Sequence, residues 1–142
     1  MTQKALLVGF ILSLALAGQA QAARLVVAIQ GIHSGDGYVY VALFAKPQGF
    51  PDGDYSIQHT KVKAAVEGLT VVFDNLPAGP YAVGAYHDEN NNGRLDTNFL
   101  GYPSEGYALS NDIRAVIARP RFVDAAFPVG SADARITLHI KY

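Results

Sequence analysis

Short runs of residues with a period of two constrain this chain more than any other feature of its sequence. Apolar side chains recur at every second position in residues 25–30, 38–44, 69–73, 81–85 and 136–142. This period places successive side chains on opposite faces of a strand, and it is typical of half-buried antiparallel strands. In the last run, Ile136, Leu138, Ile140 and Tyr142 are predicted to face inward. Residues 60–66 and 122–129 are weaker strand candidates.

Turn signals separate these runs and define the fold class. Residues 34–37 (Ser-Gly-Asp-Gly) predict a hairpin between the first two strands, and residues 76–80 (Leu-Pro-Ala-Gly-Pro) predict a second turn. Six or seven short strands at this spacing predict an all-β fold, an antiparallel β-sandwich of about seven strands. A closed barrel is the alternative. The single helical candidate covers residues 111–118, with Ser110 as its cap and Pro120 beyond its end.

The first 22 residues have the features of a secretory signal peptide. Lys4 precedes an apolar run over residues 5–17, and Ala20-Gln21-Ala22 forms an A-x-A cleavage site. The alternative is a membrane anchor, but a spanning helix needs about 20 apolar residues and this run is shorter. We therefore expect cleavage after Ala22, a single β-sandwich domain of residues 23–142, and a periplasmic or secreted location.

Composition narrows the range of partners. Removing Lys4 from the eleven basic residues leaves ten against twelve acidic residues, a balance that gives no electrostatic footprint for nucleic acid. No second long apolar run follows the signal, so no membrane span is expected in the mature chain. The chain has no cysteine, so disulfides cannot staple the domain. A protein or glycan partner outside the cytoplasm is compatible with these features but is not identified by them.

Residues 88–96 carry the one pattern that points to specific chemistry. An EF-hand-type calcium loop has oxygen ligands at positions 1, 3, 5, 7 and 9 and a glycine at position 6. These positions correspond to Asp88, Asn90, Asn92, Arg94 (through its carbonyl), Asp96 and, for the glycine, Gly93. Carboxylate, amide and carbonyl oxygens suit Ca²⁺ better than Mg²⁺, which tends to keep its water ligands.

Two features depart from a true EF-hand. Phe99 at position 12 has no carboxylate, and the preceding residues 81–87 read as a strand rather than a helix. A bound ion would need another carboxylate; Glu105 is the first candidate, and Asp112 and Asp36 are weaker ones. The expected affinity is modest, with a Kd of about 0.1–1 mM. The alternative is a plain turn, because Asn-Gly is a strong hairpin signal without any ion.

The stretch from residue 97 to residue 112 is long and lacks a strand pattern. Loops of this length in compact domains are usually functional or disordered, and its glycines, prolines and aromatics argue against disorder. Phe99, Tyr102 and Tyr107 would either form a platform for a sugar or peptide or cover one end of the sandwich, and we favour the covering role.

His87 precedes the loop on the face that carries Val83 and Ala85. A histidine at a strand end is usually a buried, hydrogen-bonded structural residue, although His87, Asp88 and Glu105 could form a hydrolase-type acid/base cluster. No nucleophile motif supports an enzyme. The four histidines have no metal-ligand spacing, so no zinc site is predicted.

Two segments resemble known families. Residues 73–81 (Phe-Asp-Asn-Leu-Pro-Ala-Gly-Pro-Tyr) resemble the corner of transthyretin-like domains, which favours a transthyretin- or immunoglobulin-like sandwich. Residues 87–107, with 120–127, resemble the bacterial exported-protein family called domain of unknown function twenty-one forty-one. That resemblance implies an exported β-sandwich with an acidic, Asn-rich loop, and it implies no substrate and no catalytic residues. We therefore predict a non-catalytic exported module in which calcium orders the loop that follows its site.

Overall fold

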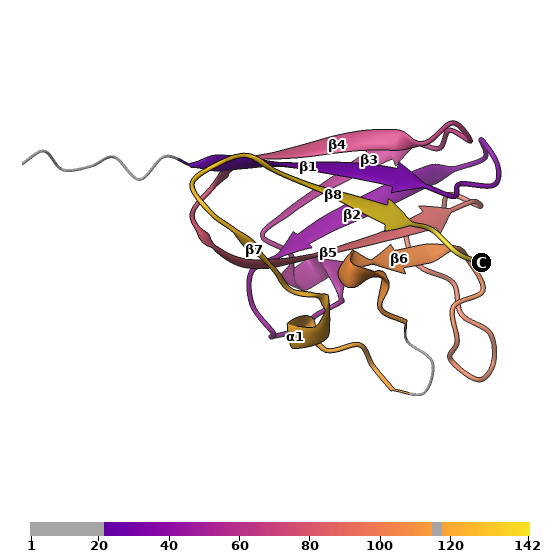
Figure 1. The fold of residues 1–142 in the computed structure, drawn as a ribbon. Coiled ribbons are helices and arrows are strands. Elements are labelled where there is room, and N and C mark those ends of the chain that lie inside the picture. The colour runs from indigo at the N-terminus through magenta and orange to yellow at the C-terminus, as the bar shows by residue number, and fades with distance from the viewer. Residues whose placement is uncertain (1–21, 115–117) are drawn as a thin grey trace, which may run out of the picture.

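The computed structural model describes residues 22–114 and 118–142, and the predicted signal peptide apart from Ala22 lies outside these residues. Two sheets lie one over the other in Figure 1. The three-stranded sheet has the order β4 (Leu69–Leu76), β1 (Ala23–Gln30), β8 (Ala134–His139). The other has the order β3 (Gln58–Lys63), β2 (Tyr38–Phe44), β5 (Gly79–Asp88), β6 (Tyr107–Leu109), with β7 (Phe127–Val129) also paired to β5. The predicted all-β sandwich is confirmed.

The core lies between the two sheets and follows the predicted alternation. Leu25, Val27 and Ile29 of β1 are fully buried, and β2 buries Val39, Val41 and Leu43 against them. Each such side chain stabilises the fold by about 1.5–3 kcal/mol relative to an exposed position. Tyr142 departs from its predicted inward position and is 52% exposed.

The strand pairing differs from a purely antiparallel, hairpin-linked sandwich. β1 and β8 run parallel, with Val27 opposite Ile136. β1 and β2 belong to different sheets, so the predicted hairpin at residues 34–37 is wrong. Residues 31–37 instead carry the chain from one sheet to the other, and Ile32 is buried on the way. The apolar faces of β1 and β2 pack face to face, which buries more apolar surface than edge-to-edge pairing.

The predicted corner at residues 76–80 also joins the two sheets. β4 ends at Leu76 and β5 begins at Gly79 in the other sheet. The Tyr81 hydroxyl donates to the Pro77 carbonyl at 2.7 Å, as in the tyrosine corner of β-sandwiches.

Three short helical turns complete the described fold: η1 (Gly53–Tyr55), η2 (Ser110–Asp112) and α1 (Phe122–Ala125). The helical candidate at residues 111–118 does not form in the part that is described, because Asn111 and Asp112 have φ of +61° and +51°. Residues 115–117 of that prediction lie outside the described residues. The strand candidate at 122–129 becomes α1 followed by β7, since Phe122 and Ala125 pack into a second apolar cluster. No helix among the described residues is long and apolar enough to span a membrane.

Candidate functional site

The 88–96 loop wraps around the carboxylate of Asp88, the last residue of β5. This side chain is fully buried. Its Oδ1 accepts the amide of Asn92 at 3.0 Å, and its Oδ2 accepts the amide of Gly93 at 2.8 Å. Asn91 and Gly93 adopt left-handed φ values of 56° and 82°, which asparagine and glycine tolerate best. The turn residues of the sequence thus fold the loop around the buried Asp88 side chain.

The side chains at loop positions 3, 5 and 9 converge on one another. Asn90 Nδ2 lies 2.7 Å from Asp96 Oδ2, and Asn92 Nδ2 lies 2.8 Å from Asp96 Oδ1. These donors, Asn92 first, lower the pKa of the Asp96 carboxyl below its usual value, and Arg94 contributes less. The Arg94 guanidinium is mostly exposed and lies 3.3 Å from Asp96 Oδ1. Asp96 is therefore a carboxylate surrounded by amide groups.

Glu105 ties the two ends of the loop together. It is 7% exposed; its Oε1 accepts the amide of Glu89 at 3.1 Å and its Oε2 the amide of Asp96 at 3.0 Å. The predicted first candidate for an extra carboxylate therefore reaches the loop. The weaker candidates lie elsewhere: Asp112 is 3.2 Å from His139 Nδ1, and Asp36 is exposed on the connection between β1 and β2.

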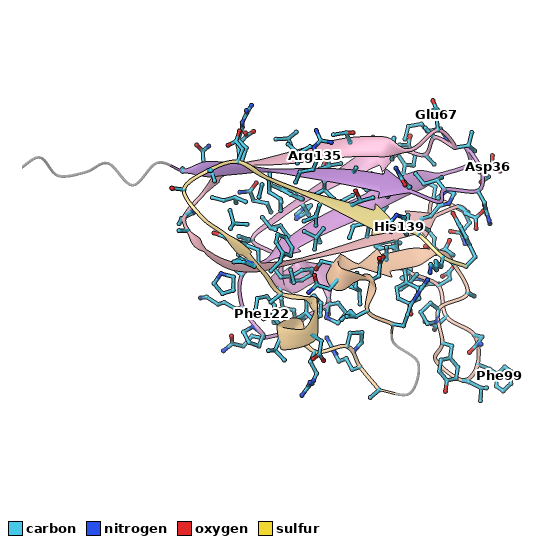
Figure 2. The ribbon with its side chains drawn as sticks, viewed as in Figure 1. Asp36, Glu67, Phe99, Phe122, Arg135 and His139 are labelled. Atoms are coloured by element: carbon cyan, nitrogen blue, oxygen red, sulfur yellow. The ribbon has the colours of Figure 1, made fainter. Side chains whose placement is uncertain are left out.

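The long stretch after the loop forms a small hairpin of its own. Thr97 and Pro103 form an antiparallel bridge, and the amide of Asn98 donates to the Tyr102 carbonyl at 2.8 Å. Phe99 is 95% exposed at the tip and projects away from both sheets in Figure 2. The favoured covering role is therefore wrong for Phe99. Tyr102 is exposed as well, whereas Tyr107 lies half-buried on β6.

A row of polar-tipped aromatics crosses the outer face of the larger sheet, and sequence reasoning missed it. Cross-strand register aligns Lys61 with Tyr40, Tyr40 with Tyr86, and Tyr86 with Tyr107. The Tyr40 and Tyr86 rings stack with centroids 5.0 Å apart and planes 1° from parallel. Burial raises the pKa of Tyr86 well above its usual value. The alternation of side chains along a strand already predicts that Tyr40 and Tyr86 face outward, but only the register between neighbouring strands puts the tyrosines in one row.

The tyrosine row adjoins a hollow of about 1000 Å³. Small residues, among them Ala42 and Gly84, lie on its sheet floor, and the 93–103 segment forms one wall. Leu100 and Tyr102 belong to that wall. Arg119 also lines the hollow, and its side chain donates to the backbone carbonyls of Gly49 and Phe50.

His87 is a buried, hydrogen-bonded residue, as predicted. Its Nε2 lies 2.7 Å from the Asp36 carbonyl and its Nδ1 lies 2.6 Å from the Tyr142 hydroxyl. A carbonyl can only accept, so Nε2 carries the proton. His87 shares the core-facing side of β5 with Val83 and Ala85, whereas the next residue, Asp88, faces the other side. The structure thus does not bring His87 together with Asp88 and Glu105 as an acid/base cluster.

The fold and the loop define a small β-sandwich protein with a carboxylate-braced, Asn-rich turn at one end. The chain belongs to a family described as an uncharacterized protein conserved in bacteria (DUF2141), whose model matches residues 27–137. Comparisons with curated proteins and with solved structures give no match.

Proposed function

We propose that this protein is an exported, non-catalytic β-sandwich module whose 88–96 loop binds Ca²⁺ and thereby orders the 97–106 hairpin. The observation that carries the proposal is the convergence of Asn90 and Asn92 on Asp96 in the loop that follows the buried Asp88. Positions 3, 5 and 9 of an EF-hand loop converge on a calcium ion in the same way, and position 1 supplies a further ligand.

The donor set fits a hard cation. Carboxylate and amide oxygens each have two lone pairs, so an oxygen that accepts one backbone amide can still ligate an ion. Asn90 and Asn92 now turn their Nδ2 groups toward Asp96, while their Oδ1 atoms accept the amides of Asn92 and Arg94. A rotation of each side-chain amide would present its oxygen to an ion and would break that bond to the backbone. An ion would then replace these amide donors, and the exposed Arg94 side chain, as the counter-charge of Asp96.

The ion would act on the hairpin through the end of the loop. Asp96 is directly followed by the hairpin, and its carbonyl accepts the amide of Ser104 at 2.8 Å. Glu105 holds the amide of Asp96 from the other side. Fixing Asp96 therefore fixes both strands of the hairpin, and with them one wall of the hollow.

Calcium-dependent thermal unfolding tests the proposal. With a Kd of about 0.1–1 mM, 10 mM Ca²⁺ would stabilise the protein by roughly 1.4–2.7 kcal/mol. For a domain of this size that is a rise in Tm of roughly 5–10 °C. EDTA should remove the rise, and Mg²⁺ should reproduce little of it.

Asp96→Asn is the diagnostic variant, because it keeps the size of the side chain and removes one ligand charge. Asp74→Asn, at an exposed position of β4, is the matched control. The calcium-induced rise in Tm should shrink in Asp96→Asn and persist in Asp74→Asn. An absent rise in the wild type, or an equal rise in Asp96→Asn, would remove calcium from the proposal.

A second candidate function is favoured by the tyrosine row beside the hollow. Stacked rings with a few polar groups near a concave surface are the usual lining of a small-ligand site. We propose a short glycan as the ligand, with sugar rings lying against Tyr40 and Tyr86, and Tyr102 on the wall. NMR titration with oligosaccharides should shift resonances of this face. Tyr102→Ala should weaken the response while Val123→Ala, at an exposed site on α1, leaves it unchanged; equal responses in both variants would exclude this site.

A further inference from the structure

Two histidines and a glutamate from two separate segments meet at the base of the loop. His33 lies on the connection between β1 and β2, His87 near the end of β5, and Glu89 at the start of the loop. One ring nitrogen of each histidine and one Glu89 carboxylate oxygen lie within 4.8 Å of one another. In the described part of the chain, this is the one group of three or more His, Cys, Asp or Glu side chains so arranged.

We propose that His33, His87 and Glu89 form a binding site for a first-row transition ion, with Zn²⁺ or Cu²⁺ as its occupant. Two imidazole nitrogens and a carboxylate are the ligand set of several zinc sites that keep a fourth position open. Calcium prefers oxygen ligands alone, so this site differs in chemistry from the 88–96 loop.

His87 is already oriented as a metal ligand would be. Its Nε2–H donates to the Asp36 carbonyl at 2.7 Å, which leaves the lone pair on Nδ1. Metal-binding histidines commonly donate their other ring N–H to a backbone carbonyl, which fixes the tautomer and the ring orientation. His87 is fully buried, so this orientation is held by packing as well.

Tyr142 occupies the lone pair of His87 in the absence of an ion. Its hydroxyl lies 2.6 Å from His87 Nδ1 and accepts the amide of His33 at 3.2 Å, while its ring stacks on His33 at 3.6 Å. An ion bound at Nδ1 would displace the Tyr142 hydroxyl, which keeps its proton and moves away from His87.

His33 and Glu89 supply the accessible half of the site. Their side chains are 49% and 32% exposed, and His33 Nε2 lies 2.6 Å from Glu89 Oε1. The rings of His33 and His87 are 5.9 Å apart between centroids and 70° from parallel. Two imidazoles on one ion, each with a metal–nitrogen distance near 2 Å, place their centroids about 5 Å apart. Small side-chain movements therefore suffice to bring both nitrogens onto one ion.

The site is separate from the calcium loop although the two share a backbone. Glu89 lies between Asp88 and Asn90 in sequence, but its carboxylate pairs with His33, whereas Asn90 pairs with Asp96. Each proposed site therefore has its own side-chain ligands. The two metal proposals can consequently succeed or fail independently.

Calorimetric titration of the untagged protein with ZnCl₂ tests the site, and electron paramagnetic resonance with Cu²⁺ reports its nitrogen ligands. We expect one Zn²⁺ per chain and a Cu²⁺ spectrum with coupling to two nitrogens. His33→Ala and Glu89→Gln should each weaken binding by roughly tenfold or more. His59→Ala, at an exposed position of β3, should leave the affinity unchanged.

Circular dichroism melts check that each variant remains folded. We expect little loss of stability, because His33 and Glu89 are partly exposed. The proposal is overturned if Zn²⁺ binds only above millimolar concentration. It is also overturned if His33→Ala binds like the wild type, or if His59→Ala weakens binding as much as His33→Ala does.

Discussion

Glu105 offers a stringent test of how the loop is held. Its carboxylate is 7% exposed and accepts the amides of Glu89 and Asp96, sixteen and nine residues away in sequence. A hydrogen bond to a charged group contributes about 1.5–3 kcal/mol net. Glu105→Ala removes two of them. Because water can reach the freed amides at this end of the sandwich, we take the lower limit for each bond and expect a loss of about 3 kcal/mol.

Urea unfolding followed by circular dichroism measures this loss, and the matching fall in Tm is roughly 10–15 °C. Glu105→Gln keeps one acceptor oxygen and places an NH₂ group against the other amide, so its loss should be about half as large. Glu67→Ala is the control, since Glu67 lies exposed on the turn before β4 (Figure 2) and should change stability by less than about 0.5 kcal/mol. If Glu105→Ala matches Glu67→Ala, Glu105 does not brace the loop.

Three further changes test the surrounding structure. Ser110→Ala removes the hydroxyl that accepts the buried amide of Val83 at 3.0 Å and donates to the carbonyl of Ala125 at 2.6 Å. Chemical denaturation should show a loss of about 2–3 kcal/mol in the free energy of unfolding. A loss under 1 kcal/mol would contradict this role. Gly37→Ala places a Cβ 1.8 Å from the carbonyl oxygen of Asp88, at a residue whose φ is +63°. Tm should therefore fall by several degrees. An unchanged Tm would mean that the connection between β1 and β2 is looser than described. Arg24, first through its side chain and then through its amide, lowers the pKa of Asp133. A lowered pKa adds stability above the unfolded value of about 3.9, and this stability disappears as the pH falls. Asp133→Asn should therefore flatten the acid limb of a stability–pH curve, and an unaltered limb would refute the pairing.

The loop illustrates what pattern reasoning can reach. Asp88, Asn90 and Gly93 specify a turn through local chemistry, because short polar side chains bond to backbone amides two to five residues away. Glu105 was predicted as the carboxylate that completes the loop, and it reaches the loop amides.

The helix expected over residues 111–118 shows how tertiary contacts override a local signal. The Ser110 hydroxyl, expected as a cap, instead donates to the Ala125 carbonyl and accepts the amide of Val83. These partners lie far away in sequence and need buried hydrogen bonds of their own. These two buried hydrogen bonds of Ser110 stabilise the protein by more than a helix N-cap, which contributes about 1 kcal/mol.

The sequence by itself determined β1, β2, β4, β5 and β8 and most of the faces that they bury, because period two is a property of each strand and needs no knowledge of its neighbours. It did not predict β6, which lies in the stretch without a strand pattern. Only the tertiary structure decided that β1 pairs in parallel with β8, that the β1–β2 connection crosses between sheets, and that Lys61, Tyr40, Tyr86 and Tyr107 form one row. The tertiary structure likewise decided that His33 lies close to His87. Contacts of this kind depend on which distant strands become neighbours, and that choice is made by the burial of the whole core.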